Sequence, residues 1–172
     1  MKNILIVVLV ILVLVTTGYI INKEGSPSGG ANYVNNVPSG ETTTVASGKV
    51  LDLSGQKLTK APMYVFSRTE IEELNLSNNE LEGALQSQVG QLKNLKILNL
   101  SNNKFTGVPA EVGQLKNLEV LNLSNNLLTG LPYELGNLSK LKLLDLSGNN
   151  YSEQDLSKIK EKLPATTVIK TN

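Results

Sequence analysis

The chain has 172 residues, enough for one domain with an appended segment. Its 16 Lys and Arg nearly balance its 15 Asp and Glu, so the net charge does not attract the molecule to nucleic acid. Nucleic acid is therefore not predicted as a partner. His and Cys are both absent, which excludes Ser-His-Asp and Cys-His catalysis, disulfides, and zinc sites built on imidazole or thiolate. The composition favours a non-enzymatic protein without cofactor or metal.

Apart from Lys2, the first 21 residues form an uncharged and mainly apolar segment. An unbroken apolar run spans residues 4–15, and residues 4–21 as a helix would measure about 27 Å, close to the roughly 30 Å of a bilayer core. We predict that residues 1–21 are a membrane anchor. The alternative is a cleaved signal peptide, with residues 4–15 as its apolar region and residues 16–18 as a poor cleavage site.

Lys2 lies before the apolar run, whereas Lys23 beyond it is offset by Glu24. This weak positive-inside bias keeps the N-terminus cytoplasmic and exports the rest of the chain. The predicted location is therefore a membrane-anchored protein with an extracytoplasmic domain, or a secreted protein if the segment is cleaved.

Residues 22–48 are rich in Gly, Ser, Thr, Asn and Pro and poor in apolar side chains. Such a composition buries too little surface to offset the entropy of ordering, so we predict a flexible linker. A Gly/Ser-type chain of this length has a root-mean-square span of about 30 Å.

From Lys49 onward the sequence repeats itself. Five units each carry a Leu-x-Leu-Ser motif, and their spacings are 23, 24, 23 and 23 residues. The first leucines of these motifs are Leu51, Leu74, Leu98, Leu121 and Leu144. The three central units extend the motif to a leading aliphatic residue, then Leu-x-Leu-x-x-Asn-x-Leu or Phe. A fourth match opens the last unit, which makes coincidence negligible.

Across residues 49–172 the chain resembles the leucine-rich-repeat family, and the Thr-Gly-x-Pro tails ending at Pro109 and Pro132 look like its 23-residue class. That class is found in bacterial surface proteins and in plant receptors and signalling scaffolds. The resemblance implies an α/β solenoid: a right-handed superhelix with a parallel β-sheet on its concave face and turns or single helical turns on its convex side. Residues 49–172 would be one domain of five repeats, including two caps.

The residue pattern agrees with this architecture. In Leu74-Asn75-Leu76 the alternation points both leucines inward and the polar residue outward. One unit cannot enclose its own apolar face, so neighbouring units must stack. An asparagine column is predicted to satisfy backbone groups in the turn after each strand and in the next repeat; it comprises Asn79, Asn103, Asn126 and Asn149.

Three units depart from the repeat: the first, the second and the last. Gln56 replaces the column asparagine in the first unit, which indicates an N-terminal cap. The second unit has one extra residue, and Gln86 stands where the other units have Pro, so its convex turn should differ.

The last unit abandons the pattern after Tyr151. Ser152 to Asp155 is a capping-box variant, and aliphatic residues at helical spacing follow before Pro164. We predict a C-terminal capping helix and, at Val168-Ile169, a closing edge strand.

Strand positions between the buried leucines should face outward and form three rows across the sheet. The first row is aliphatic apart from one residue and is the preferred partner-binding candidate, although mutual shielding or strand propensity alone would also explain it: Val50, Glu73, Ile97, Val120 and Leu143. The second row is polar, able to hydrogen-bond a ligand or simply to be solvated: Asp52, Asn75, Asn99, Asn122 and Asp145. The third alternates in charge and should support the register: Lys49, Glu72, Lys96, Glu119 and Lys142.

These observations predict a monomeric binding module for a protein or peptide ligand on the concave face. The partner-binding candidates are Glu73, Ile97, Val120, Leu143, Asn75, Asn99 and Asn122. A spacer of the cell envelope with no specific ligand is the alternative.

Overall fold

The structure is a computed structural model that describes residues 49–171. The predicted anchor, residues 1–21, and the predicted linker, residues 22–48, lie outside the described residues. Within residues 49–171, no helix combines the length and the apolar character needed to cross a bilayer.

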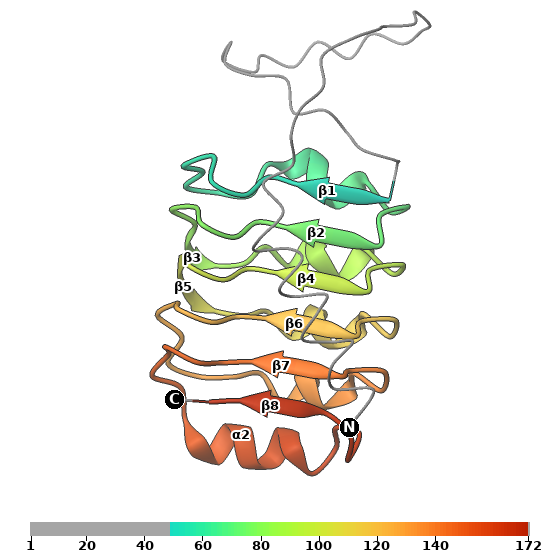
Figure 1. Cartoon of the computed structure of the whole chain (residues 1–172), viewed down its shortest axis with the longest axis vertical. Coiled ribbons are helices and arrows are strands. Elements are labelled where there is room, and N and C mark those ends of the chain that lie inside the picture. Colours follow the sequence, from blue (N-terminus) through green and yellow to red (C-terminus); the bar gives the residue numbers. More distant parts are fainter. Residues whose placement is uncertain (1–48, 172) are drawn as a thin grey trace, which may run out of the picture. The chain divides into compact units, whose positions relative to one another are not determined.

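Each repeat contributes one short strand to a six-stranded sheet, and the C-terminal segment contributes the sixth (Figure 1). All neighbouring strands are parallel and follow one another in chain order. The strands are β1 (Val50–Asp52), β2 (Glu73–Asn75), β4 (Ile97–Asn99), β6 (Val120–Asn122), β7 (Leu143–Asp145) and β8 (Val168–Lys170).

The central leucine of each strand lies beside the central leucine of the next. Leu74 pairs with Leu98, Leu98 with Leu121, and Leu121 with Leu144. Because each pairing advances by one repeat without a slip, the side chains stay on one face along the whole stack. The predicted solenoid with a parallel sheet is confirmed.

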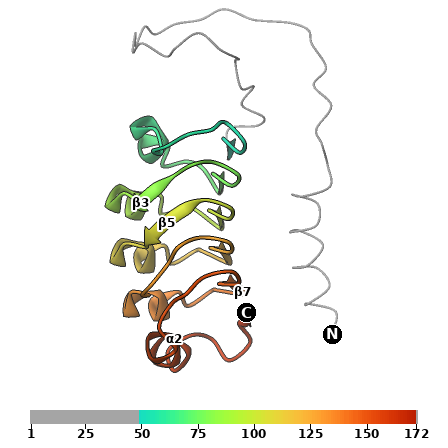
Figure 2. The same ribbon diagram turned by 90° about the vertical axis from the view of Figure 1, so that its left-hand side faces the viewer.

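The opposite side of the stack is built of single helical turns (Figure 2). Four 3-10 helices occupy it among the described residues: η1 (Met63–Ser67), η2 (Ser87–Gln91), η3 (Ala110–Gln114) and η4 (Tyr133–Asn137). A second, two-stranded parallel sheet pairs β3 (Glu82–Ala84) with β5 (Lys104–Gly107). Three of the four helical turns follow a proline in extended conformation, which has the fixed φ that suits this position.

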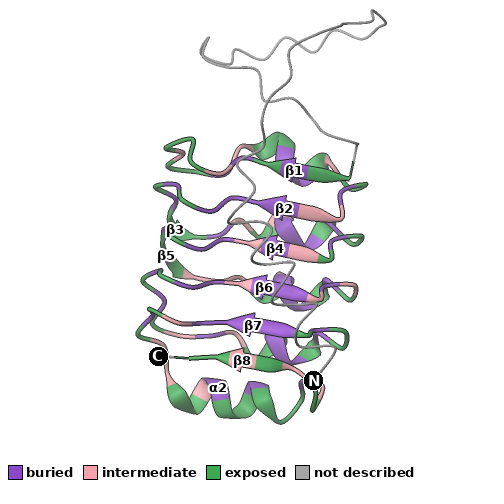
Figure 3. Cartoon of the chain, viewed as in Figure 1, coloured by how far each residue is buried: buried purple, intermediate pink, exposed green. Residues whose placement is uncertain are grey.

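A single aliphatic core fills the space between the sheet and the helical turns. Leu74, Leu76 and Leu81 are all 0% exposed, and so are the corresponding residues two repeats further on, Leu121, Leu123 and Leu128. Phe66 is the largest of the fully buried side chains in this core. Figure 3 shows β7 buried along its length, whereas β1 and β8 at the ends of the sheet carry exposed positions.

The asparagine column binds the backbone on both sides of each turn. Asn126 accepts from the Phe105 amide through Oδ1 (3.0 Å), and its Nδ2 donates to the carbonyls of Leu100, Leu123 and Ser124. The predicted structural role is confirmed, but its direction is corrected: the inter-repeat bonds reach the preceding repeat, not the next one. Among the described residues no repeat precedes the first unit, so Gln56 needs no such side chain; its backbone N–H donates to Asn79 Oδ1.

The extra residue of the second unit is absorbed before the helical turn. The β3–β5 register shifts between Gly83 and Ala84, and Gly83 has φ +72°, where a glycine is favoured. Gln86 then adopts φ −66°, much like Pro109 at −73°, so η2 begins as its neighbours do. The prediction that the convex turn differs is therefore corrected: η2 keeps the form of its neighbours, and the difference is confined to the β3–β5 bulge before it. Gln86 Nε2 also donates to the Ala61 carbonyl at 2.9 Å.

The C-terminal cap consists of helix α2 (Glu153–Lys160) and strand β8. Ser152 Oγ accepts from the Asp155 amide at 3.3 Å, as the sequence predicts. The Asp155 carboxylate, one methylene shorter than Glu, accepts instead from the Leu131 amide and the Tyr133 hydroxyl of the preceding repeat. Leu156 and Ile159 are buried and close the end of the core.

Neighbouring helical turns approach closely at a glycine. A Cβ on Gly113 would collide with the backbone carbonyl of Glu134, and one on Gly136 would lie 2.9 Å from Lys162 Cβ. The stack therefore requires the absence of a side chain at this position of the repeat.

We expect Asn126→Ala to lower the free energy of unfolding by about 3 kcal/mol, since it leaves a buried amide and several carbonyls short of partners. Urea denaturation followed by circular dichroism measures this. Asn150→Ala, at an exposed position, is the control. Equal stability of the two variants would contradict a structural role for the column.

We expect Gly113→Ala to lower the free energy of unfolding by about 2 kcal/mol, because the new methyl meets a backbone atom that must move. The matched control is Gly107→Ala, whose Cβ would find its nearest atom, Ala84 Cβ, at 3.8 Å. A smaller loss for Gly113→Ala than for Gly107→Ala would contradict the close approach.

Candidate functional site

The outward face of the six-stranded sheet carries the first two predicted rows, now extended by β8, and the third row lies in the residues that immediately precede the strands. We call them the aliphatic row (Val50, Glu73, Ile97, Val120, Leu143 and Val168), the amide row (Asp52, Asn75, Asn99, Asn122, Asp145 and Lys170) and the charge row (Lys49, Glu72, Lys96, Glu119 and Lys142). The strand register places the members of the first two rows side by side on neighbouring strands. The predicted candidates are thus brought together on one face.

The aliphatic row is less exposed than the sequence predicts. Val120 and Leu143 are 6% and 2% exposed, although neither belongs to the central core cluster. Val50 and Val168 at the ends of the row are each 37% exposed, and Ile97 is half-buried. Such a gradient is expected when each side chain packs against its row neighbours at strand spacing. The expectation that Val120 and Leu143 project into solvent is therefore corrected.

The amide row is fixed by a turn that the sequence reading overlooked. Asn99 Oδ1 accepts from both the backbone amide (3.1 Å) and the hydroxyl (2.8 Å) of Ser101. Asn75 and Asn122 make the same pair of bonds to Ser77 and Ser124. The available signal was the serine two residues after each asparagine, which is the spacing of an Asx turn.

This turn leaves donors on the sheet face. Because each Oδ1 is occupied, the Nδ2 group at the other end of the planar amide points away from the turn. The Nδ2 atoms of Asn75, Asn99 and Asn122 have no hydrogen-bond partner in the described part of the chain, and no buried side-chain polar atom there lacks one. These three donors therefore reach solvent.

The charge row forms inter-repeat ion pairs, which confirms its predicted role in register. Glu72 contacts Lys49 and Lys96, each at 2.5 Å, and Glu119 contacts Lys142 at 2.5 Å. Hydrogen bonds from Lys49 and then Lys96 lower the pKa of Glu72 to about 2. The same contact with Glu72 raises the pKa of Lys96.

Acidic groups stand at the β1–β2 end of the face. Burial, and then the neighbouring Asp52 carboxylate, raise the pKa of Glu73. No ion pair or hydrogen bond reaches the Glu73 carboxylate from the residues described. At the other end, Asp145 is paired with Lys170 at 3.5 Å. The two ends of the sheet face therefore differ in charge compensation.

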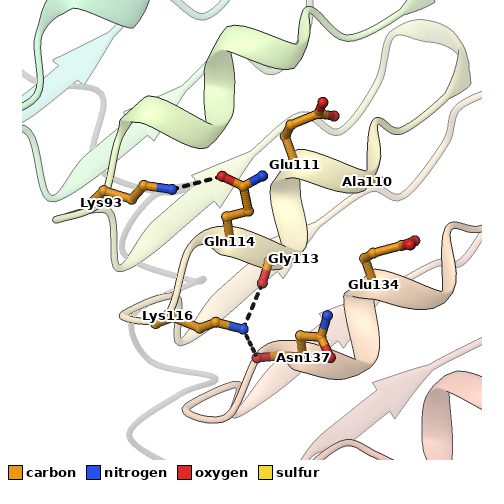
Figure 4. Close-up of a pocket in the computed structure, with 8 residues that line it drawn as sticks. All are labelled: Lys93, Ala110, Glu111, Gly113, Gln114, Lys116, Glu134 and Asn137. Atoms are coloured by element: carbon orange, nitrogen blue, oxygen red, sulfur yellow. Dashed lines mark hydrogen bonds between the residues drawn. The ribbon is translucent and has the colours of Figure 1, made fainter.

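A hollow lies on the helical side, between η3 and its neighbours (Figure 4), with a volume of about 410 Å³. Its cationic groups already have partners. Lys116 Nζ donates to the carbonyls of Gly113 and Asn137, and Lys93 Nζ donates to Gln114. These contacts join adjacent helical turns, so the hollow is a by-product of stacking and a weaker candidate than the sheet face.

Comparison with known proteins identifies the repeat. The family model described as "Leucine rich repeat" matches residues 49–105 and 93–150. Leucine-rich repeat-containing protein 10 of Bos taurus is 44% identical over 57 residues, which are 33% of this chain and 20% of that protein. This chain thus spans only a fifth of the relative's length.

Solved structures give the same fold. A leucine-rich-repeat protein of Leptospira interrogans matches with a TM-score of 0.60 and 41% identity over 64% of this chain and 28% of that one. The plant peptide hormone receptor RGFR1, in complex with RGF2, matches with a TM-score of 0.58 and 33% identity over 70% of this chain and 21% of that one.

The Glu72 ion pairs make stability depend on pH with a definite sign. Because the folded-state pKa is depressed to about 2, the stabilisation is complete above the unfolded-state value of about 4.3 and is lost as pH falls from about 4 to about 2. We expect Glu72→Gln to have a lower Tm than the wild type at pH 7 and an equal one near pH 2. High salt should also narrow the gap, since these pairs are solvent-accessible. A gap unchanged by pH would contradict the assignment.

Proposed function

Because the chain belongs to the leucine-rich-repeat family, we propose that residues 49–172 are a non-enzymatic module that binds a protein or peptide ligand on the predicted concave, sheet-bearing face. The observation that carries this proposal is the set of partnerless amide donors on Asn75, Asn99 and Asn122, held in place by Asx turns. Pre-oriented donors lose little entropy when a ligand supplies the acceptors.

Half-buried apolar surface next to these donors supports the same face. Ile97 lies beside Asn99 two residues along the strand, and Val50 lies at the exposed end of the aliphatic row. A protein ligand would bury this surface while its carbonyl groups meet the amides. The peptide-bound receptor among the similar structures is consistent with this use of the fold.

The location proposed for the module is extracytoplasmic. Residues 1–21 would anchor it in a membrane, or be removed from a secreted form, and residues 22–48 would tether it. We further propose that the module acts as a monomer and that its repeats are of the 23-residue class. The spacer role remains the outcome to be expected if no ligand is found.

Asparagine-to-aspartate exchange provides a sharp test of the amide row. Asp145 already makes the same two bonds to Ser147 that the asparagines make to their serines, so an aspartate fits this turn. Asn99→Asp with Asn122→Asp therefore keeps the acceptor, removes the donor and adds a negative charge, which the control must match. With ligands captured on the full-length chain and then purified, we expect at least about a tenfold loss of affinity.

The matched control is Asn137→Asp with Asn150→Asp, which adds the same two charges at exposed asparagines away from the sheet face. Calorimetric titration measures the affinity, and circular dichroism confirms folding. Affinity unchanged in the sheet variant, or lost only in the control, would place the ligand elsewhere. Failure to capture any ligand would favour the spacer.

A further inference from the structure

The side chains of the sheet face differ in solvent exposure, and this difference limits the positions at which a ligand can bind. Asp52 is exposed, and Glu73, Ile97 and Asn99 are half-buried. In contrast, Asp145 is 8% exposed, and the aliphatic-row members on β6 and β7 are buried. Apart from the exposed positions of β8 and the half-buried Asn122 of β6, the part of the face that a ligand can reach runs over β1, β2 and β4.

This accessible part carries two carboxylates without a cation. Asp52 and Glu73 lie on adjacent strands and on the same face, with Glu73 directly opposite Val50 in the register. The nearby lysines, Lys49 and Lys96, are both bonded to Glu72 in the charge row. Among the described residues no cation pairs with either carboxylate, whereas Asp145 at the far end has Lys170.

Asn75 adds an independent observation at the same place. It is 6% exposed, sits directly beside Asp52 in the register, and turns its Oδ1 toward Ser77. Its Nδ2 has no partner among the described residues and reaches solvent, so a donor held in place by its turn is left on the sheet face beside the two acids. Such a pre-oriented donor loses little entropy when a ligand supplies the acceptor.

We propose that the β1–β4 part of the sheet face binds an extended peptide segment, with a Lys or Arg side chain of that segment held between Asp52 and Glu73. The carbonyl oxygens of the segment accept from Asn75 and Asn99. This inference rests on the proposed function and names its ligand class.

The neighbours of Glu73 suit a long cationic side chain. Val50 and Ile97 flank Glu73 on either side in the aliphatic row. The methylene stem of Lys or Arg packs on such aliphatic groups while its charged head reaches a carboxylate. The raised pKa of Glu73 fits a carboxylate that lacks its cation. Phosphate-bearing ligands and acidic glycans are disfavoured, because the two carboxylates repel them.

The experiment uses the full-length chain in detergent micelles and three fluorescent pools of short synthetic peptides. Each pool has blocked ends and randomised Ser, Thr and Val at the outer positions, with a fixed central Arg, norleucine or Glu. Fluorescence anisotropy gives the affinities. We expect the Arg pool to bind at least about tenfold more tightly than the norleucine pool, and the Glu pool to bind most weakly.

Two variants assign this preference to the acids. The double variant, Asp52→Asn with Glu73→Gln, removes both charges. The single variant, Asp52→Asn, removes only the exposed charge, and its fold should be kept because Asn75 occupies the same kind of turn in the next repeat. The preference for Arg should vanish in the double variant and fall in the single one. The matched control, Glu82→Gln with Glu134→Gln, removes two carboxylates elsewhere on the surface and should leave the preference unchanged.

The outcomes separate this inference from the proposed function. If all three pools bind equally, and Asn99→Asp weakens them equally, the sheet face binds peptides but the cation pocket is wrong. An Arg preference that survives in the double variant also overturns the inference, as does the absence of binding by any pool at about 1 mM. If no pool binds, the proposed function is still supported when a folded protein partner is captured by the wild type and not by the amide-row variants.

Discussion

The whole structure depends on the fact that one repeat cannot bury its own leucines. A three-residue strand and one helical turn enclose an aliphatic layer only when another repeat lies on each side. The register must therefore be kept without slips, because a shift of one residue would turn the buried leucine outward. Three interactions enforce it here: the paired leucines of adjacent strands, the buried asparagines that bond backbone of the preceding repeat, and the alternating charges of Lys49, Glu72 and Lys96.

Most of the fold of residues 49–171 could be predicted because the repeat encodes it several times. The strand positions, the leucine columns, the ion-pair row and the C-terminal cap all follow from periodicity that chance does not produce. Burial of the aliphatic row could not be predicted, because alternation says which way Leu143 points but not how closely its neighbours pack. The sequence also did not predict that the asparagine side chains bond the preceding repeat. The spacing of the asparagines is the same in both directions along the stack, whereas the side-chain geometry selects one of them.

The positions where the repeat is broken show how much variation stacking tolerates. The extra residue of the second unit produces a bulge at Gly83, yet the following helical turn keeps its place because Gln86 adopts the backbone angle of the prolines. An inserted residue is accommodated in the segment between the strand and the helical turn of the repeat. At Gly113 an added side chain cannot be accommodated, because the next turn lies against it. The tolerance of each position thus follows from its distance to the neighbouring repeat.

The same stacking determines which side chains remain for function. Ion pairs and asparagine bonds between repeats occupy many polar groups, and on the helical side Lys116 is engaged by the carbonyls of Gly113 and Asn137. The sheet face is different, since each Asx turn uses only the oxygen of its amide and leaves the nitrogen. At the ends of the stack the pattern of charges also changes: Lys170 of β8 compensates Asp145, but within residues 49–171 no strand precedes β1 to do the same for Asp52. The uncompensated Asp52 therefore follows from its place on the first strand of the described sheet, and a cationic ligand group would take the place there that Lys170 fills at the other end.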